Sequence, residues 1–256
     1  MTGPLWVLFG GVLGGVIGSF LATLILRWPA GRSIAQGRSA CDGCGAPIDP
    51  VRMVPILSFA LARGQAGCCG TRIDPSHPIV EILAALIGAL AFTIAPPIEA
   101  AAGAVFGWLL LTLALLDLRH FWLPDRLTIP LLAFGLIGGL AGIGPPLDDR
   151  LIGMVGGYVA LEAVRIGYAK VRGREGLGRG DAKLFAAIGA WLGWRAMPVV
   201  LLLASLIGLG MVLGLMLMKR APNRTDRLPL GTCLCLAAWP VWGTSAILSA
   251  LWRSQT

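Results

Sequence analysis

The apolar positions of this chain form long uninterrupted runs rather than a short alternation of buried and exposed positions. An apolar run of roughly 20 residues crosses the hydrocarbon core of a membrane as a helix. We predict eight such helices, over residues 5–26, 78–95, 100–116, 127–143, 151–168, 182–197, 199–218 and 230–251. The sixth gives the weakest signal, because its apolar core, Leu184–Trp194, is short for a full crossing. The pattern predicts an all-α polytopic membrane protein.

Composition excludes a soluble domain, since 56% of the 256 residues are hydrophobic, 13% are charged and the mean hydropathy is +0.79. The net charge of +8 would favour nucleic-acid binding in a soluble protein. Here the distribution of charge indicates membrane topology instead. With the N-terminus outside, all but three of the 21 Lys and Arg residues lie on the cytoplasmic side, the exceptions being Arg150, Arg195 and Arg253. We therefore expect lipid surroundings and no nucleic-acid partner.

One connection is long, the predicted cytoplasmic loop 27–77, and it holds four of the six cysteines. The prediction divides the chain into an N-terminal region, 1–95, and a membrane core, 96–256. A transporter built from inverted repeats is an alternative, but it requires two related halves. The long loop has no counterpart after the fourth predicted helix.

Two aspartates border the apolar runs and are candidates for chemistry. Asp117 ends the third run, and Asp181 follows a glycine-rich segment and opens the sixth. The predicted topology puts both at the same membrane face, where an ionisable group is costly and commonly functional. Two carboxyl groups brought together share a proton, so that one acts as a general base and the other as a general acid.

Structural roles compete with this interpretation. Asp181 could cap its helix, as Asp does at a helix N-terminus. Asp117 could pair with Arg119 at the membrane interface. For Asp125, which follows a proline and precedes the fourth predicted helix, we favour a helix-capping role.

Two segments carry a resemblance to a known family. They are D-L-R-H-F-W-L-P-D-R-L-T, residues 117–128, and R-E-G-L-G-R-G-D-A-K-L, residues 174–184, which contains a G-x-G-D motif. Together with G-A-W-L-G-W at 189–194, they resemble the active-site segments of bacterial type IV prepilin peptidases. The N-terminal G-S-F-L, R-W-P and C-D-G-C segments resemble the longer, bifunctional members. The resemblance extends from about residue 11 to residue 194, and L-P-L-G at 228–231 resembles a remnant of a further family segment.

The resemblance implies an aspartic endopeptidase of the bacterial inner membrane. Such enzymes remove the leader of type IV prepilins or type II secretion pseudopilins at the cytoplasmic membrane face, and the long forms then N-methylate the new terminus with S-adenosylmethionine. By this resemblance Asp117 and Asp181 are catalytic. The supporting residues are Gly178, Gly180, Asp125, Glu175 and Lys183. The alternatives are a peptidase without methyltransferase activity, a proton- or ion-coupled transporter, and a catalytically silent scaffold of a secretion machine.

Two positions depart from the family pattern, Ala22 in place of an Asn and Ala66 in place of a Cys. The methyltransferase activity rests on the resemblance alone, because a 51-residue loop, 27–77, is too small for a βαβ nucleotide-binding domain.

The loop cysteines predict a structural zinc site. Two Cys pairs about 25 residues apart are typical of a zinc ribbon, in which four thiolates surround the metal tetrahedrally. Cys41, Cys44 and Cys69 keep this spacing, and Cys68 is the candidate fourth ligand, although adjacent residues seldom point the same way. A metal-free thiol loop is the alternative.

Overall fold

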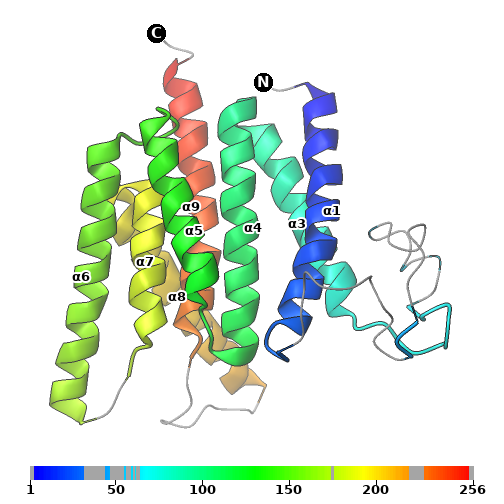
Figure 1. Cartoon of the computed structure of the whole chain (residues 1–256). Helices are drawn as coiled ribbons and strands as arrows, with labels where there is room; N and C mark the ends of the chain where they lie inside the picture. Colours follow the sequence, from blue (N-terminus) through cyan, green and yellow to red (C-terminus); the bar gives the residue numbers. More distant parts are fainter. Residues whose placement is uncertain are drawn as a thin grey trace. The chain divides into compact units, whose positions relative to one another are not determined.

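The described part of the chain is folded into helices (Figure 1). The computed structural model describes residues 3–31, 44–46, 55, 59, 61, 64–173, 176–218 and 228–253. Within these ranges the extended structure is limited to one isolated bridge, between Gln65 and Arg72. With the labels of Figure 1, the helices are α1 (Pro4–Arg27), α3 (Ser76–Ile94), α4 (Pro97–His120), α5 (Asp125–Leu140), α6 (Leu147–Arg172), α7 (Arg179–Leu192), α8 (Met197–Leu217) and α9 (Leu230–Arg253).

Each of the eight predicted apolar runs lies on an observed helix, so the all-α prediction is confirmed, but the predicted number of membrane-crossing helices is not. Six of the helices that the structure describes are long and apolar enough to cross a membrane, namely α1, α3, α4, α6, α8 and α9. The other two, α5 and α7, have 16 and 14 residues. At 1.5 Å per residue these are roughly 24 and 21 Å long, below the ~30 Å of a hydrocarbon core. The weakness of the sixth predicted run therefore has a structural basis.

The chain divides into two compact units, Met1–Trp108 and Leu109–Thr256, with the boundary inside α4. The proposed division between residues 95 and 96 remains a prediction. In the first unit α1 and α3 pack side by side along a seam of glycines. A Cβ at Gly14 would collide with the carbonyl oxygen of Ala84, and one at Gly18 would lie 2.7 Å from the Cα of Glu81. Small residues at every fourth position let the two backbones approach closely.

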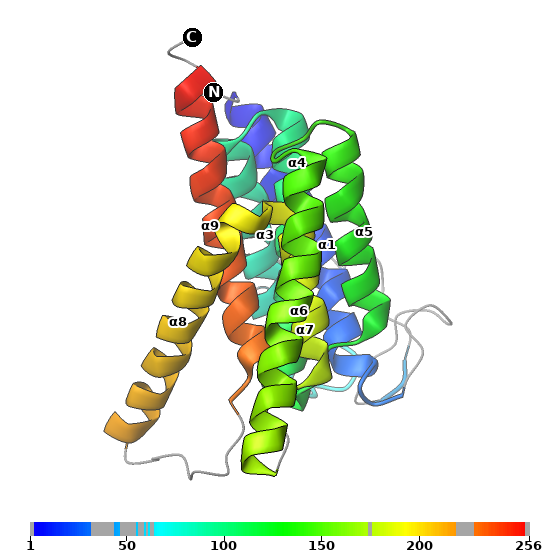
Figure 2. The same ribbon diagram turned by 90° about the vertical axis from the view of Figure 1, so that its left-hand side faces the viewer.

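In the second unit α7 is the most enclosed helix. It contacts α5, α6 and α9, and 11 of its 14 residues are buried. Figure 2 shows α6 in the foreground with α7 behind it. A Cβ at Gly153 of α6 would lie 2.8 Å from the carbonyl oxygen of Gly189 of α7, so these helices also meet through glycines. This packing fixes the helix that carries Asp181.

Arg150 joins three elements at the other end of this unit. Its side chain is buried and donates hydrogen bonds to the carbonyl oxygens of Pro145 (2.8 Å), Ala190 (3.2 Å), Gly135 and Ile143. The carbonyls near helix C-termini carry partial negative charge, which a cation stabilises. Arg150 thus ties the start of α6 to the last turns of α5 and α7.

Candidate active site

Asp117 lies in the last turn of α4 and is 5% exposed. Its Oδ2 atom accepts two hydrogen bonds from Thr232, one from the backbone N–H (2.7 Å) and one from the hydroxyl (3.1 Å). Among the described residues these are its donors, so the alternative pairing with Arg119 does not occur. A buried carboxylate needs such donors, because burial without them disfavours its charged form.

Asp181 lies in the first turn of α7 and is 8% exposed. It precedes the apolar part of that helix, outside the six helices long enough to cross a membrane. Burial, followed by the charge of Asp117, raises the pKa of Asp181 from 3.8 to about 6, while backbone hydrogen bonds from Gly178 and Gly231 act in the opposite direction. Adjacent residues of α9, Thr232 and Gly231, hydrogen-bond Asp117 and Asp181 respectively, so the two carboxyl groups lie close together.

The capping interpretation of Asp181 is correct in part. The residue at the N-cap position of α7 is Gly178, and Asp181 stands three residues later. Its Oδ2 accepts the N–H of Gly178 at 3.1 Å, the back-bond that an acidic residue makes in a capping box. Capping and proximity to Asp117 therefore occur together in the same side chain.

The start of α9 is the third part of the site, and sequence reasoning did not assign it a role. The first N–H groups of a helix have no partner within the helix and favour negative charge. Here the N–H of Thr232 faces Asp117, and the backbone of Gly231 hydrogen-bonds Asp181. A Cβ at Gly231 would lie 3.0 Å from the carboxylate of Asp117, so a side chain there would crowd the pair. The only sequence signal was the Pro-Leu-Gly segment 229–231 that opens this helix.

Of the predicted supporting residues, the structure places Gly178 and Gly180 beside the pair, since Gly178 bonds Asp181 and Leu123 lies against both Gly180 and Gly231. Gly180 lies against the side chain of Leu123, which would be 2.9 Å from a Cβ at that position. Asp125 is the first residue of α5 rather than its N-cap, which is Pro124, so the predicted capping role of Asp125 was wrong. Its carboxylate instead pairs with the Lys183 ammonium at 2.8 Å. Glu175 lies outside the described residues.

A cavity of about 210 Å³ adjoins this ion pair. Asp125 and Lys183 line it together with Thr128, Ile129, Leu132, Tyr158 and Ala186. Neither Asp117 nor Asp181 contributes to its wall, so the cavity is separate from the carboxyl pair.

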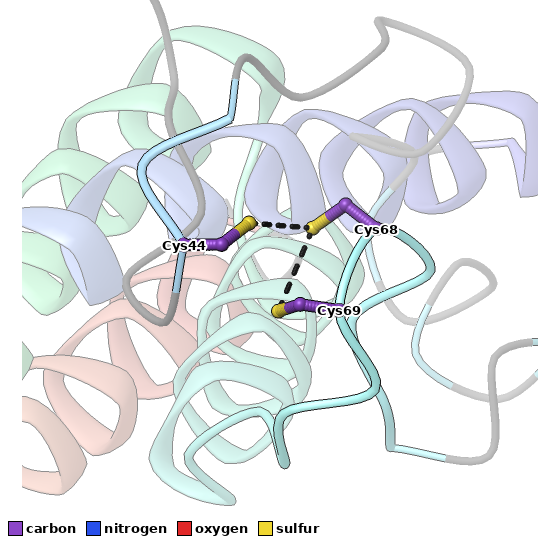
Figure 3. A group of neighbouring side chains, drawn as sticks. All are labelled: Cys44, Cys68 and Cys69. Atoms are coloured by element: carbon purple, nitrogen blue, oxygen red, sulfur yellow. Dashed lines mark hydrogen bonds between the residues drawn. The ribbon is translucent and has the colours of Figure 1, made fainter.

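Three loop cysteines of the first unit lie together (Figure 3). The Sγ atoms of Cys44 and Cys68 are 3.3 Å apart, and those of Cys68 and Cys69 are 3.8 Å apart. Thiolates around a tetrahedral zinc with ~2.3 Å bonds lie roughly 3.8 Å from one another, so three donors fit a metal ion. Cys41, the other predicted ligand, lies outside the described residues.

A tight turn explains how two adjacent cysteines point the same way. Ala66 pairs with Thr71, and the Gly70 N–H donates to the carbonyl of Ala66 at 2.7 Å. Gly70 has φ +71°, a left-handed conformation that suits glycine. This backbone turn allows the adjacent side chains of Cys68 and Cys69 to point the same way, which adjacent residues seldom do.

The fold and site define a multi-pass α-helical membrane protein with a pair of buried, interacting aspartates. Residues 104–213 match the type IV leader peptidase family, and residues 12–95 match the bacterial peptidase A24 N-terminal domain. A protein of Aeromonas hydrophila named prepilin leader peptidase/N-methyltransferase is 41% identical over 211 residues, which cover 81% of this chain and 72% of that protein. The chain belongs to the type IV leader peptidase family.

Two longer matches carry the same name. The Pseudomonas aeruginosa protein is 35% identical over 91% of this chain and 89% of its own length. The Stutzerimonas stutzeri protein is 33% identical over 96% of this chain and 94% of its own length. No solved structure matches the chain. The resemblance noted from the two aspartate segments is confirmed.

Proposed function

We propose that this protein is an aspartic endopeptidase that removes the leader of type IV prepilins or type II secretion pseudopilins and then methylates the new N-terminal amine. The relatives named prepilin leader peptidase/N-methyltransferase support both activities, and they give no support to a transporter. The observation that carries the proposal is the burial of Asp117 and Asp181 together at the start of α9.

The chemistry of such a pair is peptide hydrolysis. One carboxylate takes a proton from a water molecule, whose oxygen attacks the carbonyl carbon of the scissile bond. The other carboxylic acid protonates the carbonyl oxygen. The tetrahedral intermediate then loses the amine, which leaves with a proton, and the two carboxyl groups return to their starting state.

The cellular setting is proposed as well. The excess of Lys and Arg on one side supports a bacterial inner membrane protein whose carboxyl pair faces the cytoplasm, with prepilins and membrane lipid as its partners. In this orientation the leader of a prepilin reaches the pair from the side on which the prepilin is made.

We propose zinc as a structural ion held by the loop cysteines. Cys44, Cys68 and Cys69 would hold it, and binding would stabilise a loop that has little core of its own. S-adenosylmethionine is the proposed methyl donor. The described residues of Met1–Trp108 contain no strand–helix–strand unit of the type that binds dinucleotides, so we assign no residue to it.

Mass spectrometry of a co-expressed prepilin tests the proposal. The wild-type protein should remove the leader, while Asp117→Asn and Asp181→Asn should leave it in place although both variants remain in the membrane. Asp148→Asn is the matched control, because this exposed carboxylate at the start of α6 should be dispensable. Normal processing by either of the first two variants would contradict the mechanism.

A further inference from the structure

Thr232 makes an unusual pair of contacts with Asp117. Its backbone N–H and its hydroxyl both address the same carboxylate oxygen, Oδ2, at 2.7 and 3.1 Å. The hydroxyl also lies 3.0 Å from the carbonyl oxygen of Ala114, one turn earlier in α4. A hydroxyl has a single hydrogen, so it donates to only one of these two acceptors at a time.

These contacts favour a charged Asp117. A backbone N–H can only donate, so Oδ2 has to act as an acceptor and cannot carry the proton toward it. Hydrogen bonds to the ionised form of a carboxyl group favour that form. The Oδ1 atom faces no donor among the described residues and remains available to a water molecule.

The surroundings of Asp181 differ in one donor. Its carboxylate accepts backbone hydrogen bonds from Gly178, at 3.1 Å, and from Gly231, but no side-chain hydroxyl donates to it within the described part of the chain. Burial and the charge of Asp117 raise its pKa to about 6, which is consistent with this geometry.

We propose that Thr232 is a positioning residue that holds Asp117 as the ionised, water-activating member of the pair and leaves Asp181 as the member that carries the proton. This inference rests on the proposed peptidase function. Asp117 takes the water proton on Oδ1 as the water oxygen bonds to the carbonyl carbon, and Asp181 protonates the carbonyl oxygen. Asp117 then protonates the leaving nitrogen, the C–N bond breaks and Asp181 recovers its proton from the diol oxygen.

The hydroxyl of Thr232 changes its hydrogen-bond acceptor as Asp117 gains and loses a proton. While Asp117 is ionised, the hydroxyl donates to Oδ2. Once Asp117 is neutral, its oxygen is a weaker acceptor, and the hydroxyl turns to the carbonyl of Ala114. Thr232 is 4% exposed, so solvent does not compete for its hydrogen.

Thr232 comes 115 residues after Asp117, and it lies beyond residues 104–213, the stretch that matches the peptidase family. A role in holding α9 against α4 is the competing explanation, since the bond to Ala114 alone would serve it.

Few other titratable groups face Asp117. Asp181 approaches from α7, and the thiols of Cys233 and Cys235 approach from α9. The charges of Asp125 and Lys183 neutralise one another in their ion pair. Helix α8 contributes no ionisable side chain. Asp117 and Asp181 are therefore the buried carboxyl groups among the described residues of the unit Leu109–Thr256, and the exposed Arg119 and His120 share the last turn of α4 with Asp117.

Steady-state cleavage of a synthetic prepilin segment by the full-length protein in detergent, across pH, tests the proposal. Thr232→Val removes the hydroxyl but keeps the shape and the backbone N–H. We expect kcat to fall about tenfold with KM within about twofold, and the acidic limb of the kcat profile to move to higher pH, because the ionised form of Asp117 has lost a donor. Thr232→Ser should restore both. Thr244→Val is the control, since it removes a hydroxyl of the same helix that donates to the carbonyl of Val241 at 2.9 Å.

The outcomes separate the two proposals. A wild-type protein that does not cleave would overturn the peptidase function. A wild-type protein that cleaves, with Thr232→Val lowering stability but leaving the pH profile in place, would overturn the role of Thr232 and leave the peptidase intact.

Infrared spectroscopy provides a measurement that needs no Thr232 variant. The protonated carboxyl band that titrates near pH 6 should disappear in Asp181→Asn and persist, at a lower pH, in Asp117→Asn. The opposite pattern would overturn the assignment of the proton to Asp181.

Discussion

The burial of Asp181 conflicts with its charge. An unfolded Asp ionises near pH 3.9, whereas the pKa of Asp181 in the folded protein is raised to about 6. Between these values the folded chain binds more protons than the unfolded chain, so stability falls as pH rises through this window. Above about pH 6 the carboxyl group of Asp181 is ionised in both states, and the full free-energy cost of burying its charge is present. The burial of Asp181 thus lowers the stability of the folded chain at neutral pH.

Replacing Asp181 with Asn should stabilise the protein while it abolishes cleavage. The amide is neutral at all relevant pH values, so the penalty disappears, and we expect a gain of about 1–3 kcal/mol at pH 8 and little change near pH 4. Thermal unfolding in detergent at pH 8 and at pH 4 measures this gain in stability. Asp148→Asn, at an exposed position, is the control. An equal loss of stability at both pH values would contradict the argument.

The sequence identified Asp117 and Asp181 because each stands at a conspicuous place, the border of an apolar run, within a recognisable local segment. It did not identify Thr232 or Gly231, whose importance arises only when the start of α9 meets the end of α4. Local patterns carry no information on such a contact. The same limitation explains Asp125, where the pattern predicted a cap and a distant partner, Lys183, determined the outcome.

At the scale of elements, close contacts between glycine-containing helix faces determine which helices pack against each other. Lipid is as apolar as the helices, so membrane helices associate by close packing rather than by burial of apolar surface. The lengths of the apolar runs predicted the helices well. They could not predict that α1 pairs with α3 or α6 with α7, because the pairing depends on which small residues face each other.

Substitution of Gly14 tests the α1–α3 seam. Its Cβ would collide with the backbone of Ala84, which cannot move without displacing α3, so Gly14→Ala should cost about 1–3 kcal/mol. Gly11→Ala is the matched control in the same helix, since its Cβ would meet the Cβ of Ala89 at an ordinary 3.6 Å. Thermal unfolding of the two variants in detergent should separate them. Equal midpoints would show that the seam is not a tight contact.

Arg150 offers a second test at this scale. Arg150→Met fills similar space but removes the donors that join α5, α6 and α7, and we expect a loss of about 2–4 kcal/mol. Arg195→Met is the control, because Arg195 is exposed and its 3.6 Å pairing with Asp149 is worth less than about 1 kcal/mol. Denaturation of both variants in detergent measures the difference, and similar losses would contradict a structural role for Arg150.

At the scale of the whole molecule, the proposed methylation depends on the proposed hydrolysis, whereas hydrolysis does not depend on methylation. Methylation needs the amine that hydrolysis exposes, so it cannot precede leader removal. The carboxyl pair belongs to the unit Leu109–Thr256, and the cysteine cluster belongs to Met1–Trp108. The two units therefore have chemically distinct parts whose variants should give different products.

Substitution of Cys68 should separate these products. Cys68→Ser removes the sulfur that lies nearest to both other thiols, so we expect bound zinc to fall at least about tenfold and methylation of a co-expressed prepilin to fall with it, because the loop is no longer held. Leader removal should stay within about twofold of the wild type.

Asp117→Asn should instead yield uncleaved, unmethylated prepilin with normal zinc content, and Cys233→Ala in α9 should keep the metal. Metal analysis and mass spectrometry of the prepilin measure both effects. Loss of leader removal in Cys68→Ser at a normal membrane level would show that hydrolysis also depends on the cysteine cluster.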